Sequence, residues 1–346
     1  MQRADVVVVG AGPAGLVLAH RLHQAGLGTV VLESRSRAYV EGRVRAGVLE
    51  APTVALLEEM GVADRLHAEG LIHDGVLLQW EGERHRIDLA ALAGAAVTVY
   101  GQQEIVHDLV AARVAAGGDL RFEAEVTGVG GTMGASPSRG DAGVVVSYRD
   151  AGGDRHDVRC DVVAGCDGSH GASRTWIPPA ALQVMERDHP YAWLGILADV
   201  APSTDQLIYA FHERGFALHS MRSPSVSRLY LQVAPDERLE EWPDDRIWAE
   251  LQRRLALDGW TLQEGPVREK GITPMRSLVA APMRHGQLFL AGDAAHIVPP
   301  TGAKGLNLAV ADAKVLGDAL VAWYRSGDQT GLDSYSDRCL ERVWRV

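Results

Sequence analysis

The segment DVVVVGAGPAGLVLAHRLHQAGLGTVVLES, residues 5–34, constrains the fold more than any other part of the chain. The unbroken valines from Val6 to Val9 are typical of a parallel strand that is buried on both faces. After a glycine turn, apolar residues from Leu16 to Leu22 fall on one side of a predicted helix. GTVVLES then predicts a second strand, so the segment indicates a βαβ unit.

The glycine turn has the pattern G-x-G-x-x-G, at Gly10, Gly12 and Gly15. The first glycine of such a turn permits the tight bend, the second lets a pyrophosphate approach the backbone, and the third permits close helix–strand packing. The phosphates then lie at the positive end of the helix. Glu33 ends the second strand, where a carboxylate accepts hydrogen bonds from an adenosine ribose. The pattern predicts a dinucleotide site; a glycine turn with only a structural role is the alternative.

Further along the chain, residues 47–70 predict helices, 77–89 strands, and 97–117 a strand followed by a helix. Residues 130–141 form a low-complexity segment, which we expect to be an exposed hairpin loop. Between about 180 and 275 the pattern changes to that of antiparallel strands and one helix. We therefore predict an α/β fold, with a Rossmann-like domain into which an antiparallel-sheet domain is inserted. The predicted boundaries are 1–73, 98–179 and 266–346 for the first domain, and 74–97 and 180–265 for the second.

Composition excludes several classes of function. With 346 residues the chain is long enough for two domains, and its net charge of −11 argues against broad nucleic-acid binding. The three cysteines match neither a disulfide framework nor a metal-ligand spacing, so we expect no metal. No apolar run approaches the roughly 18 residues that a membrane span requires, and the N-terminus lacks the pattern of a signal peptide. We expect a cytoplasmic protein without a membrane partner.

Two glycine-rich corners remain. In GCDGSHGASR, residues 165–174, a strand leads to a carboxylate and a turn that would face the same dinucleotide or form an ordinary tight loop. In GDAAHIVPPTGAKGLNLA, residues 292–309, Asp293 could hydrogen-bond a polyol chain, and the two prolines fix the direction of a carbonyl. The amides from Gly302 to Leu306 would open a helix and stabilise an anion such as a reduced flavin. A proline-terminated loop that caps a helix is the alternative.

Taken together, GAGPAG, CDG and GDAAHIVPP resemble the motifs of class A flavoprotein monooxygenases. GRVRAGVLE, TVYGQ, LIYA, RGFAL and SMRS extend this resemblance along nearly the whole chain. It implies the glutathione-reductase-type flavoprotein hydroxylase fold, with FAD as cofactor and NADPH or NADH and O2 as co-substrates. Among family members, the motifs are most similar to those that convert 4-hydroxybenzoate to 3,4-dihydroxybenzoate through a flavin hydroperoxide.

The resemblance also assigns the cofactor residues. It implies that FAD is held by Gly10, Gly12, Gly15, Glu33, Arg43, Arg45, Gln102, Asp293, Gly302, Leu306 and Asn307. Arg45 and Gln102 have an alternative reading as surface or capping residues. Arg45, His170 and Arg276 match positions that contact the nicotinamide coenzyme, although His170 and Arg276 could instead be structural. The segment ESRSRAY, residues 33–39, lies where family members select NADPH or NADH, and it leaves the choice open.

For the substrate, the resemblance implies that Ser220, Arg222 and Tyr230 bind the carboxylate. A guanidinium with two hydroxyl groups makes a directional anion site, whereas an arginine on a strand is more often a solvated surface charge. Tyr209 and the carbonyl of Pro300 would contact the phenol hydroxyl. His73 would end a proton relay, because a histidine with a pKa near 6.5 exchanges protons around neutrality; an ordinary, partly exposed histidine is the alternative.

Two alternatives to this function stay open. One is a hydroxylase of another small aromatic acid such as 4-aminobenzoate. The other is a flavin-binding protein without productive turnover, since family members continue beyond CLERVWRV with a second relay tyrosine and with helices of a dimer interface. A homodimer is the assembly that the resemblance implies. Retained yellow colour without substrate-stimulated NAD(P)H oxidation would favour the second alternative.

Overall fold

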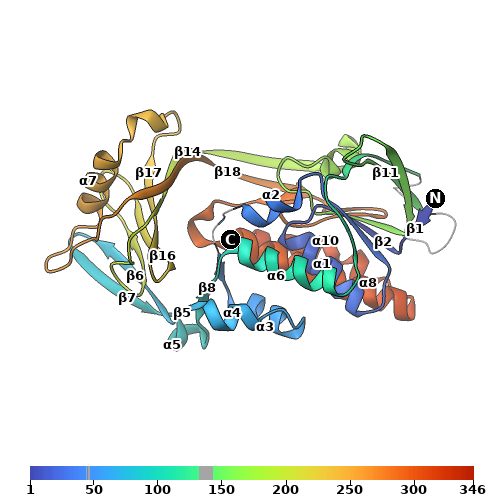
Figure 1. The fold of residues 1–346 in the computed structure, drawn as a ribbon, viewed down its shortest axis with the longest axis horizontal. Helices are drawn as coiled ribbons and strands as arrows, with labels where there is room; N and C mark the ends of the chain where they lie inside the picture. Colours follow the sequence, from blue (N-terminus) through green and yellow to red (C-terminus); the bar gives the residue numbers. More distant parts are fainter. Residues whose placement is uncertain (44, 46, 132–142) are drawn as a thin grey trace.

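The computed structural model describes residues 1–43, 45, 47–131 and 143–346. Nearly all of the loop that we predicted at 130–141 lies outside these residues. The described part of the chain forms two bodies that two long strands connect, β14 (Gln183–Ala198) and β18 (Val267–Ala281), as the upper part of Figure 1 shows.

The first body is built on a six-stranded sheet in the order β19-β20-β13-β2-β3-β9. All neighbouring pairs are parallel except β19 with β20. Every residue of β2, β3 and β13 is buried, which explains their unbroken apolar sequences. The predicted βαβ unit is confirmed as β2, α1 and β3. The bounds are β2 (Val6–Val9), β3 (Thr29–Leu32), β9 (Asp119–Arg121), β13 (Val162–Gly165), β19 (Arg284–His285), β20 (Leu288–Leu290) and α1 (Pro13–Gln24).

Helices cover this sheet. α1 packs against α6 and α8, and these three helices lie side by side in the centre of Figure 1. Leu16, Leu18 and Leu22 of α1 are buried, but so are Val17 and His20, so α1 is buried around most of its circumference and not only on the one side that the sequence predicted. Apart from α1 and α7, the α-helices are α2 (Arg37–Gly42), α3 (Ala51–Glu59), α4 (Asp64–Glu69), α5 (Leu89–Ala93), α6 (Gln102–Ala115), α8 (Lys304–Ser326), α9 (Thr330–Asp333) and α10 (Tyr335–Val343).

The second body is an eight-stranded sheet in the order β21-β18-β14-β17-β16-β15-β6-β7. Its pairs are antiparallel except β15 with β6, so the inserted antiparallel sheet is confirmed. Helix α7 (Asp244–Arg254) buries Ile247, Trp248 and Leu251 in an apolar core with one face of this sheet. The remaining bounds are β6 (Gly75–Trp80), β7 (Glu83–Asp88), β15 (Leu207–Ala210), β16 (Ala217–Ser223), β17 (Val226–Val233) and β21 (His296–Ile297).

Two smaller sheets complete the described chain. A four-stranded sheet, in the order β1-β12-β11-β10, lies beside the N-terminus at the right of Figure 1. A three-stranded sheet, in the order β4-β8-β5, connects α3 and α4 to α6 and to the large sheet. In the described residues, no helix is both long and apolar enough to cross a bilayer. The bounds are β1 (Gln2–Arg3), β10 (Glu125–Gly130), β11 (Val144–Arg149), β12 (Arg155–Cys160), β4 (Val48–Leu49), β5 (Leu71–His73) and β8 (Val97–Val99).

Candidate active site

The three glycines of the turn after β2 and of the start of α1 have different roles. Gly10 has φ +103°, and a Cβ on it would lie 2.4 Å from the carbonyl oxygen of Cys166. A Cβ on Gly15 would lie 2.1 Å from the carbonyl oxygen of Gly10. By contrast, a Cβ on Gly12 would have no atom of the described chain within 4 Å. Packing therefore explains Gly10 and Gly15, whereas Gly12 faces open space, in which a ligand can approach the backbone.

Glu33 lies against this turn, as its position at the end of β3 predicts. One of its carboxylate oxygens accepts a hydrogen bond from the amide of Ala11 at 2.8 Å, and the other accepts one from the amide of Arg35 at 2.8 Å. A carboxylate has about four lone-pair positions. Glu33 therefore orders both loops and can still accept a hydrogen bond from a ribose hydroxyl.

The predicted corner after β13 contains a carboxylate oxygen that lacks a partner. Asp167 Oδ2 accepts hydrogen bonds from the amide and the hydroxyl of Ser173, at 2.8 and 2.9 Å. Asp167 Oδ1 is buried and has no hydrogen-bond partner in the described chain. Burial raises the pKa of Asp167, and the hydrogen bonds from Ser173 oppose this rise. Because buried polar atoms are normally paired, this orphan oxygen, in a residue whose Cα lies against Gly10, points to a ligand near this turn.

The Asp293 corner follows β20. Gly292 adopts φ +64°, and Asp293 then projects from a 3₁₀ turn (Gly292–Ala294). Desolvation by the surrounding protein raises the pKa of Asp293, although the nearby positive charges of His296 and three arginines act against it. Those arginines are Arg45, Arg43 and Arg276. The fold thus brings three of the predicted cofactor and coenzyme residues into electrostatic reach of Asp293.

Helix α8 begins with uncapped amides. Ala303, which precedes it, adopts φ +51°, a left-handed conformation that costs a non-glycine residue about 1 kcal/mol. No side chain caps this helix start, and Leu306 is buried in the first turn. Gly302 ends the short 3₁₀ turn that starts at Pro300. The carbonyl of Pro300 accepts a hydrogen bond from the amide of Ala303 at 2.9 Å, which leaves one lone pair for a substrate hydroxyl.

The Asn307 side chain holds the α8 start in place. Its Oδ1 accepts hydrogen bonds from the amide of Glu50 and the hydroxyl of Thr53, at 2.9 and 2.8 Å. Its Nδ2 donates to the carbonyls of Val48 and Ala303, at 2.9 and 3.0 Å. All four hydrogen-bonding positions of this amide are therefore used within the protein.

These observations fit FAD. The open space at Gly12, the orphan oxygen of Asp167 and the uncapped amides of α8 are features that a dinucleotide with an anionic ring would complete. Gln102 is the first residue of α6. His170 is exposed, with its Nδ1 2.9 Å from the Ser169 hydroxyl, and Arg276 pairs with Glu186 at 3.3 Å.

One face of the large sheet collects the predicted substrate residues. Tyr209 pairs with Leu218, Leu218 pairs with Tyr230, and Ser220 pairs with Arg228. Because paired residues share a face and alternate residues of a strand do so too, Tyr209, Ser220 and Tyr230 project from the same side. The opposite face, with His219 and Leu229, is fully buried and packs toward the core.

Aromatic rings and one missing side chain shape this face. Tyr209, Leu218 and Tyr230 share an apolar cluster with Trp193, whose ring centroid lies 4.8 Å from that of Tyr230. A Cβ on Gly195 would lie 3.2 Å from the Tyr230 ring and 3.3 Å from an Arg228 nitrogen. A glycine at 195 therefore gives the tyrosine and the arginine room to lie across the sheet.

The polar groups on this face are prepared for an anion. Arg228 Nε donates to the Tyr230 hydroxyl at 3.1 Å, which leaves the hydroxyl hydrogen of Tyr230 free to donate elsewhere. The Ser220 hydroxyl donates to the carbonyl of Arg228 at 2.9 Å. It must turn from that carbonyl to donate to a substrate.

Arg222 is half-buried among neutral acceptors. It donates to the carbonyl of Arg45 at 3.1 Å and to the side-chain carbonyl of Gln103. Burial lowers the pKa of Arg222, and the neighbouring charge of Arg228 lowers it further. In the part of the chain that the structure describes, no carboxylate forms an ion pair with Arg45, Arg222 or Arg228. None of the three is therefore neutralised by direct contact with a carboxylate, which leaves them able to bind an anion.

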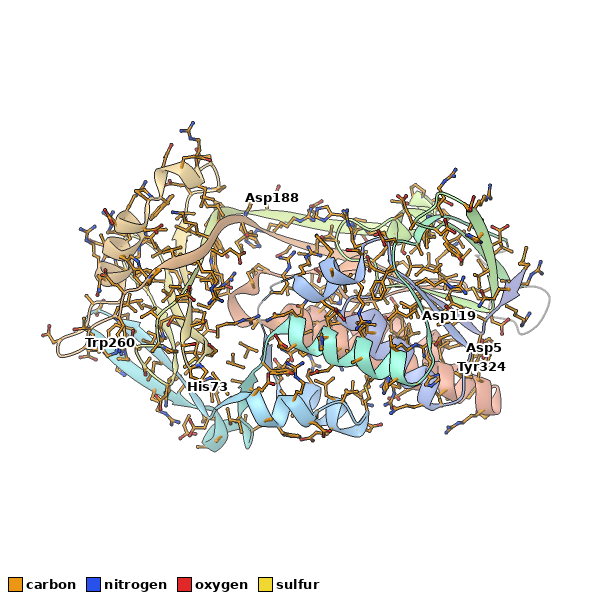
Figure 2. All side chains as sticks on the ribbon, in the orientation of Figure 1. Asp5, His73, Asp119, Asp188, Trp260 and Tyr324 are labelled. Atoms are coloured by element: carbon orange, nitrogen blue, oxygen red, sulfur yellow. The ribbon has the colours of Figure 1, made fainter. Side chains whose placement is uncertain are left out.

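His73 ends β5 and is almost fully buried, where Figure 2 labels it between the large sheet and helices α3 and α4. Its Nε2 has no hydrogen-bond partner among the described residues. Burial lowers the pKa of His73, while a backbone contact and the charge of Asp205 raise it. No direct hydrogen bond joins His73 to Tyr209 in the described chain, so any proton path between them needs an intermediary such as water.

Sequence reasoning missed three residues of this region: Arg228, Gln103 and Asp312. Arg228 carries a visible signal, since it lies two residues before Tyr230 and alternation places both on one face. Gln103 acts through a contact 119 positions away, and Asp312 through contacts 16 and 20 positions away, which no local pattern reveals.

Comparison with known proteins agrees with this geometry. Residues 3–346 match the family model described as FAD binding domain. The chain is 46% identical to p-hydroxybenzoate hydroxylase from Acinetobacter baylyi, over 99% of this chain and 83% of that protein. It is 29% identical to 3-(3-hydroxy-phenyl)propionate/3-hydroxycinnamic acid hydroxylase from Mycobacterium sp. (strain JLS), of which it spans 56%.

A solved structure supports the same conclusion. The crystal structure of p-nitrophenol 4-monooxygenase PnpA from Pseudomonas putida DLL-E4 superposes with a TM-score of 0.84 at 25% identity, covering 98% of this chain and 85% of that one. The chain therefore belongs to the FAD binding domain family, as an FAD-dependent oxidoreductase related to p-hydroxybenzoate hydroxylase.

Proposed function

We propose that this chain hydroxylates 4-hydroxybenzoate at position 3. The substrate, O2, NAD(P)H and a proton give 3,4-dihydroxybenzoate, NAD(P)⁺ and water. One observation carries the proposal: Arg222 and Arg228, which form no ion pair with a carboxylate of the described chain, lie near Tyr230, and Tyr209 projects from the same face of the large sheet as Tyr230. The 46% identity to a protein named p-hydroxybenzoate hydroxylase supports the choice of substrate.

The carboxylate end of the substrate is assigned to Arg222, Ser220 and Tyr230. The Arg222 guanidinium supplies charge and direction, because it can donate two parallel hydrogen bonds to a carboxylate. The Tyr230 hydroxyl accepts from Arg228, so its own hydrogen can be donated to the carboxylate as a further hydrogen bond. Trp193 and Leu218 form the apolar surroundings in which these polar contacts are strengthened by exclusion of water.

The phenol end is assigned to Tyr209, Pro300 and His73. Burial raises the pKa of Tyr209, so its hydroxyl keeps its proton and can donate to a substrate phenolate. The remaining lone pair of the Pro300 carbonyl would accept from the neutral phenol. His73 has a buried, unpaired Nε2 that would accept the phenol proton through water. A phenolate ring is richer in electrons than a phenol ring, which favours attack by an electrophilic oxygen.

FAD, held by the residues named above, would supply the redox chemistry between NAD(P)H and O2. The coenzyme is assigned to Arg45, His170 and Arg276, two of which lie within electrostatic reach of Asp293. NADPH and NADH both fit this assignment. The proposal also includes the domain division at 73/74, 97/98, 179/180 and 265/266, a homodimer and a cytoplasmic location. A mass of twice 37.2 kDa in light scattering would support the homodimer.

The test is NAD(P)H oxidation by the FAD-loaded protein in air, with and without 4-hydroxybenzoate. Strong stimulation with a matching amount of 3,4-dihydroxybenzoate supports the proposal. Stimulation by 4-aminobenzoate alone would transfer the assignment to another aromatic acid. A yellow protein without stimulation by either acid would contradict hydroxylation by this chain.

A further inference from the structure

The guanidinium of Arg222 is oriented without being neutralised. Its Nη2 donates to the side-chain carbonyl of Gln103, and its Nη1 donates to the main-chain carbonyl of Arg45 at 3.1 Å. Both acceptors are uncharged, so the guanidinium is fixed in direction while its full charge is kept. A carboxylate at position 103 would fix the direction equally well but would compete with an anionic ligand.

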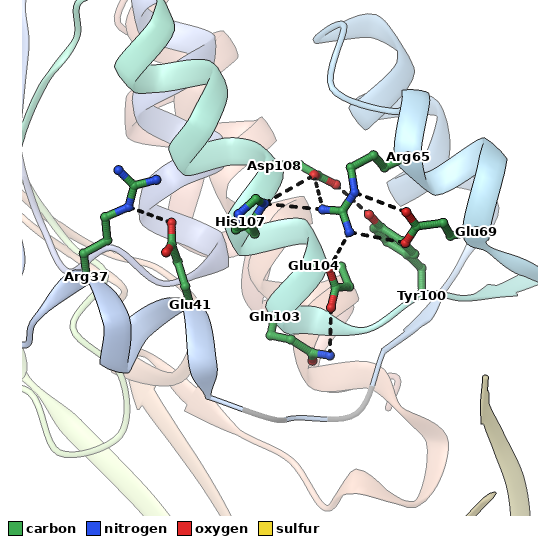
Figure 3. A network of polar contacts seen from close by, with 9 residues as sticks. All are labelled: Arg37, Glu41, Arg65, Glu69, Tyr100, Gln103, Glu104, His107 and Asp108. Atoms are coloured by element: carbon green, nitrogen blue, oxygen red, sulfur yellow. Dashed lines mark hydrogen bonds and ion pairs between the residues drawn. The ribbon is translucent and has the colours of Figure 1, made fainter. Parts of the chain in front are cut away.

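A carboxylate is present one residue further along α6, in Glu104, and its charge acts on Arg222. Figure 3 shows that this carboxylate is occupied on both oxygens. Arg65 Nη2 donates to one at 2.6 Å, and Gln103 Nε2 donates to the other at 3.3 Å. The Gln103 amide thus uses its oxygen for Arg222 and its nitrogen for Glu104, and it lies between the two.

Arg65 is itself held in position by several acidic groups. It donates to Asp108 at 2.7 Å and to Glu69 at 3.2 Å, and Tyr100 donates to Asp108 at 2.7 Å (Figure 3). The hydrogen bond that Arg65 donates to Glu104 is the largest of the contacts that raise the pKa of Arg65. This network connects α4, the residue directly after β8 and α6, so Glu104 is kept on the side of α6 that faces α4.

Gly101 leaves the space in which Arg222 and Gln103 meet. A Cβ on Gly101 would lie 2.7 Å from Arg222 Nη2 and 2.7 Å from Gln103 Nε2. The turn before α6 therefore accommodates the two side chains only because residue 101 has none.

We propose that Gln103 is a positioning residue for substrate binding: its neutral amide directs Arg222 toward the substrate carboxylate, while Arg65 keeps the carboxylate of Glu104 from competing. This inference rests on the proposed function, since it takes Arg222 as the group that binds the carboxylate. It makes residue 103 a determinant of the preference for anionic over neutral aromatic ligands.

The primary variant is Gln103→Glu in the FAD-loaded protein. Dissociation constants are measured from the change in flavin absorbance for 4-hydroxybenzoate and for its uncharged analogue 4-hydroxybenzamide. We expect binding of the acid to weaken about 10- to 100-fold, the range for a hydrogen bond to a charged group, and binding of the amide to change much less. The kcat at saturating acid should change less than KM. Gln263→Glu, which adds the same charge at an exposed site of the second body, is the matched control.

A second pair of variants tests the role of Arg65. Arg65→Met should weaken binding of the acid because it releases Glu104, and adding Glu104→Gln should restore the binding. A merely structural role for Arg65 predicts no such rescue, because the double variant lacks two partners of the network instead of one.

The outcomes separate this inference from the proposed function. If the unaltered protein binds the acid no more tightly than the amide, the assignment of Arg222 fails. If it prefers the acid but Gln103→Glu weakens both ligands equally, or neither, the positioning role of Gln103 is overturned while the proposed function stands. Selective loss of acid binding, with rescue in the double variant, supports the inference.

Discussion

Asp312 on α8 fixes both sides of the Asp293 corner through His296 and the backbone. Its Oδ2 lies 2.6 Å from Nε2 of His296 and accepts a hydrogen bond from the amide of Gly292 at 3.0 Å. Both side chains are almost completely buried. Burial lowers the pKa of His296, but the facing carboxylate of Asp312 outweighs this and raises the pKa overall. The pair therefore positions the corner that carries Asp293.

This pair predicts a pH dependence of stability. Because the pKa of His296 is raised in the folded state, its protonation contributes stability that is complete below the unfolded value of about 6.5 and is lost as the pH rises through the raised value. His296→Gln removes this contribution. Urea unfolding at several pH values should therefore show the largest difference between variant and unaltered protein in acid, and a smaller one in alkali. A difference that grows with pH would contradict the account.

A second histidine predicts the opposite slope. His219 is fully buried, its Nε2 accepts a hydrogen bond from the amide of Ser203 at 3.1 Å, and burial lowers its pKa to about 4. His219 is therefore protonated below about pH 6.5 in the unfolded chain, but only below about pH 4 in the folded protein. Stability should fall by about 3 kcal/mol as the pH drops through this window. His219→Gln should flatten the slope in calorimetry between pH 4 and 6.5; an unchanged slope would show that other groups dominate.

Gly12 offers a test of cofactor binding that separates binding from folding. Gly12→Ala adds a methyl group where the described chain has no atom within 4 Å, so the apoprotein should unfold at an unchanged temperature. The same methyl group would occupy the space left for the pyrophosphate, and the dissociation constant for FAD should rise at least about tenfold. Fluorescence titration with FAD and thermal unfolding of the apoprotein measure the two effects.

Gly15→Ala is the contrasting variant. Its methyl group would lie 2.1 Å from the carbonyl oxygen of Gly10, so it should destabilise the apoprotein itself. If both variants bind FAD as tightly as the unaltered protein, the glycine turn does not hold the cofactor.

Arg222→Met tests the carboxylate anchor directly. Removing the guanidinium should weaken binding of 4-hydroxybenzoate about 10- to 100-fold, because a charged hydrogen-bonding partner is lost, while FAD stays bound. Arg86→Met, at a surface position of β7 in the same sheet, should leave the affinity unchanged. Equal loss with both variants would indicate a general effect of charge.

The spacing of residues within short segments of the sequence was sufficient to predict part of the site. Glu33 contacts the glycine turn because the βαβ unit places the end of β3 beside the end of β2, and this geometry depends on short segments. Tyr209, Ser220 and Tyr230 meet on one face because alternation within each strand sets the direction of their side chains. Such relationships depend on spacings of a few residues, so the sequence predicts them.

Other parts depend on contacts that no local pattern contains. Gln103 meets Arg222 across 119 positions of the sequence, and Asn307 meets Thr53 across 254. Asn307 was expected among the cofactor residues, and only the fold reveals that every hydrogen-bonding position of its amide is used within the protein. Contacts of this kind arise when whole helices and strands pack together, so the sequence predicted these elements better than the side-chain contacts between them.

The most direct measurement is the fate of molecular oxygen. The FAD-loaded protein is supplied with NAD(P)H, 4-hydroxybenzoate and ¹⁸O2, and the product is analysed by mass spectrometry. We predict 3,4-dihydroxybenzoate with one labelled oxygen at position 3, formed in proportion to the NAD(P)H consumed. Consumption of NAD(P)H with all of the label in peroxide or water, and none in a dihydroxybenzoate, would contradict the proposal that this chain is a hydroxylase.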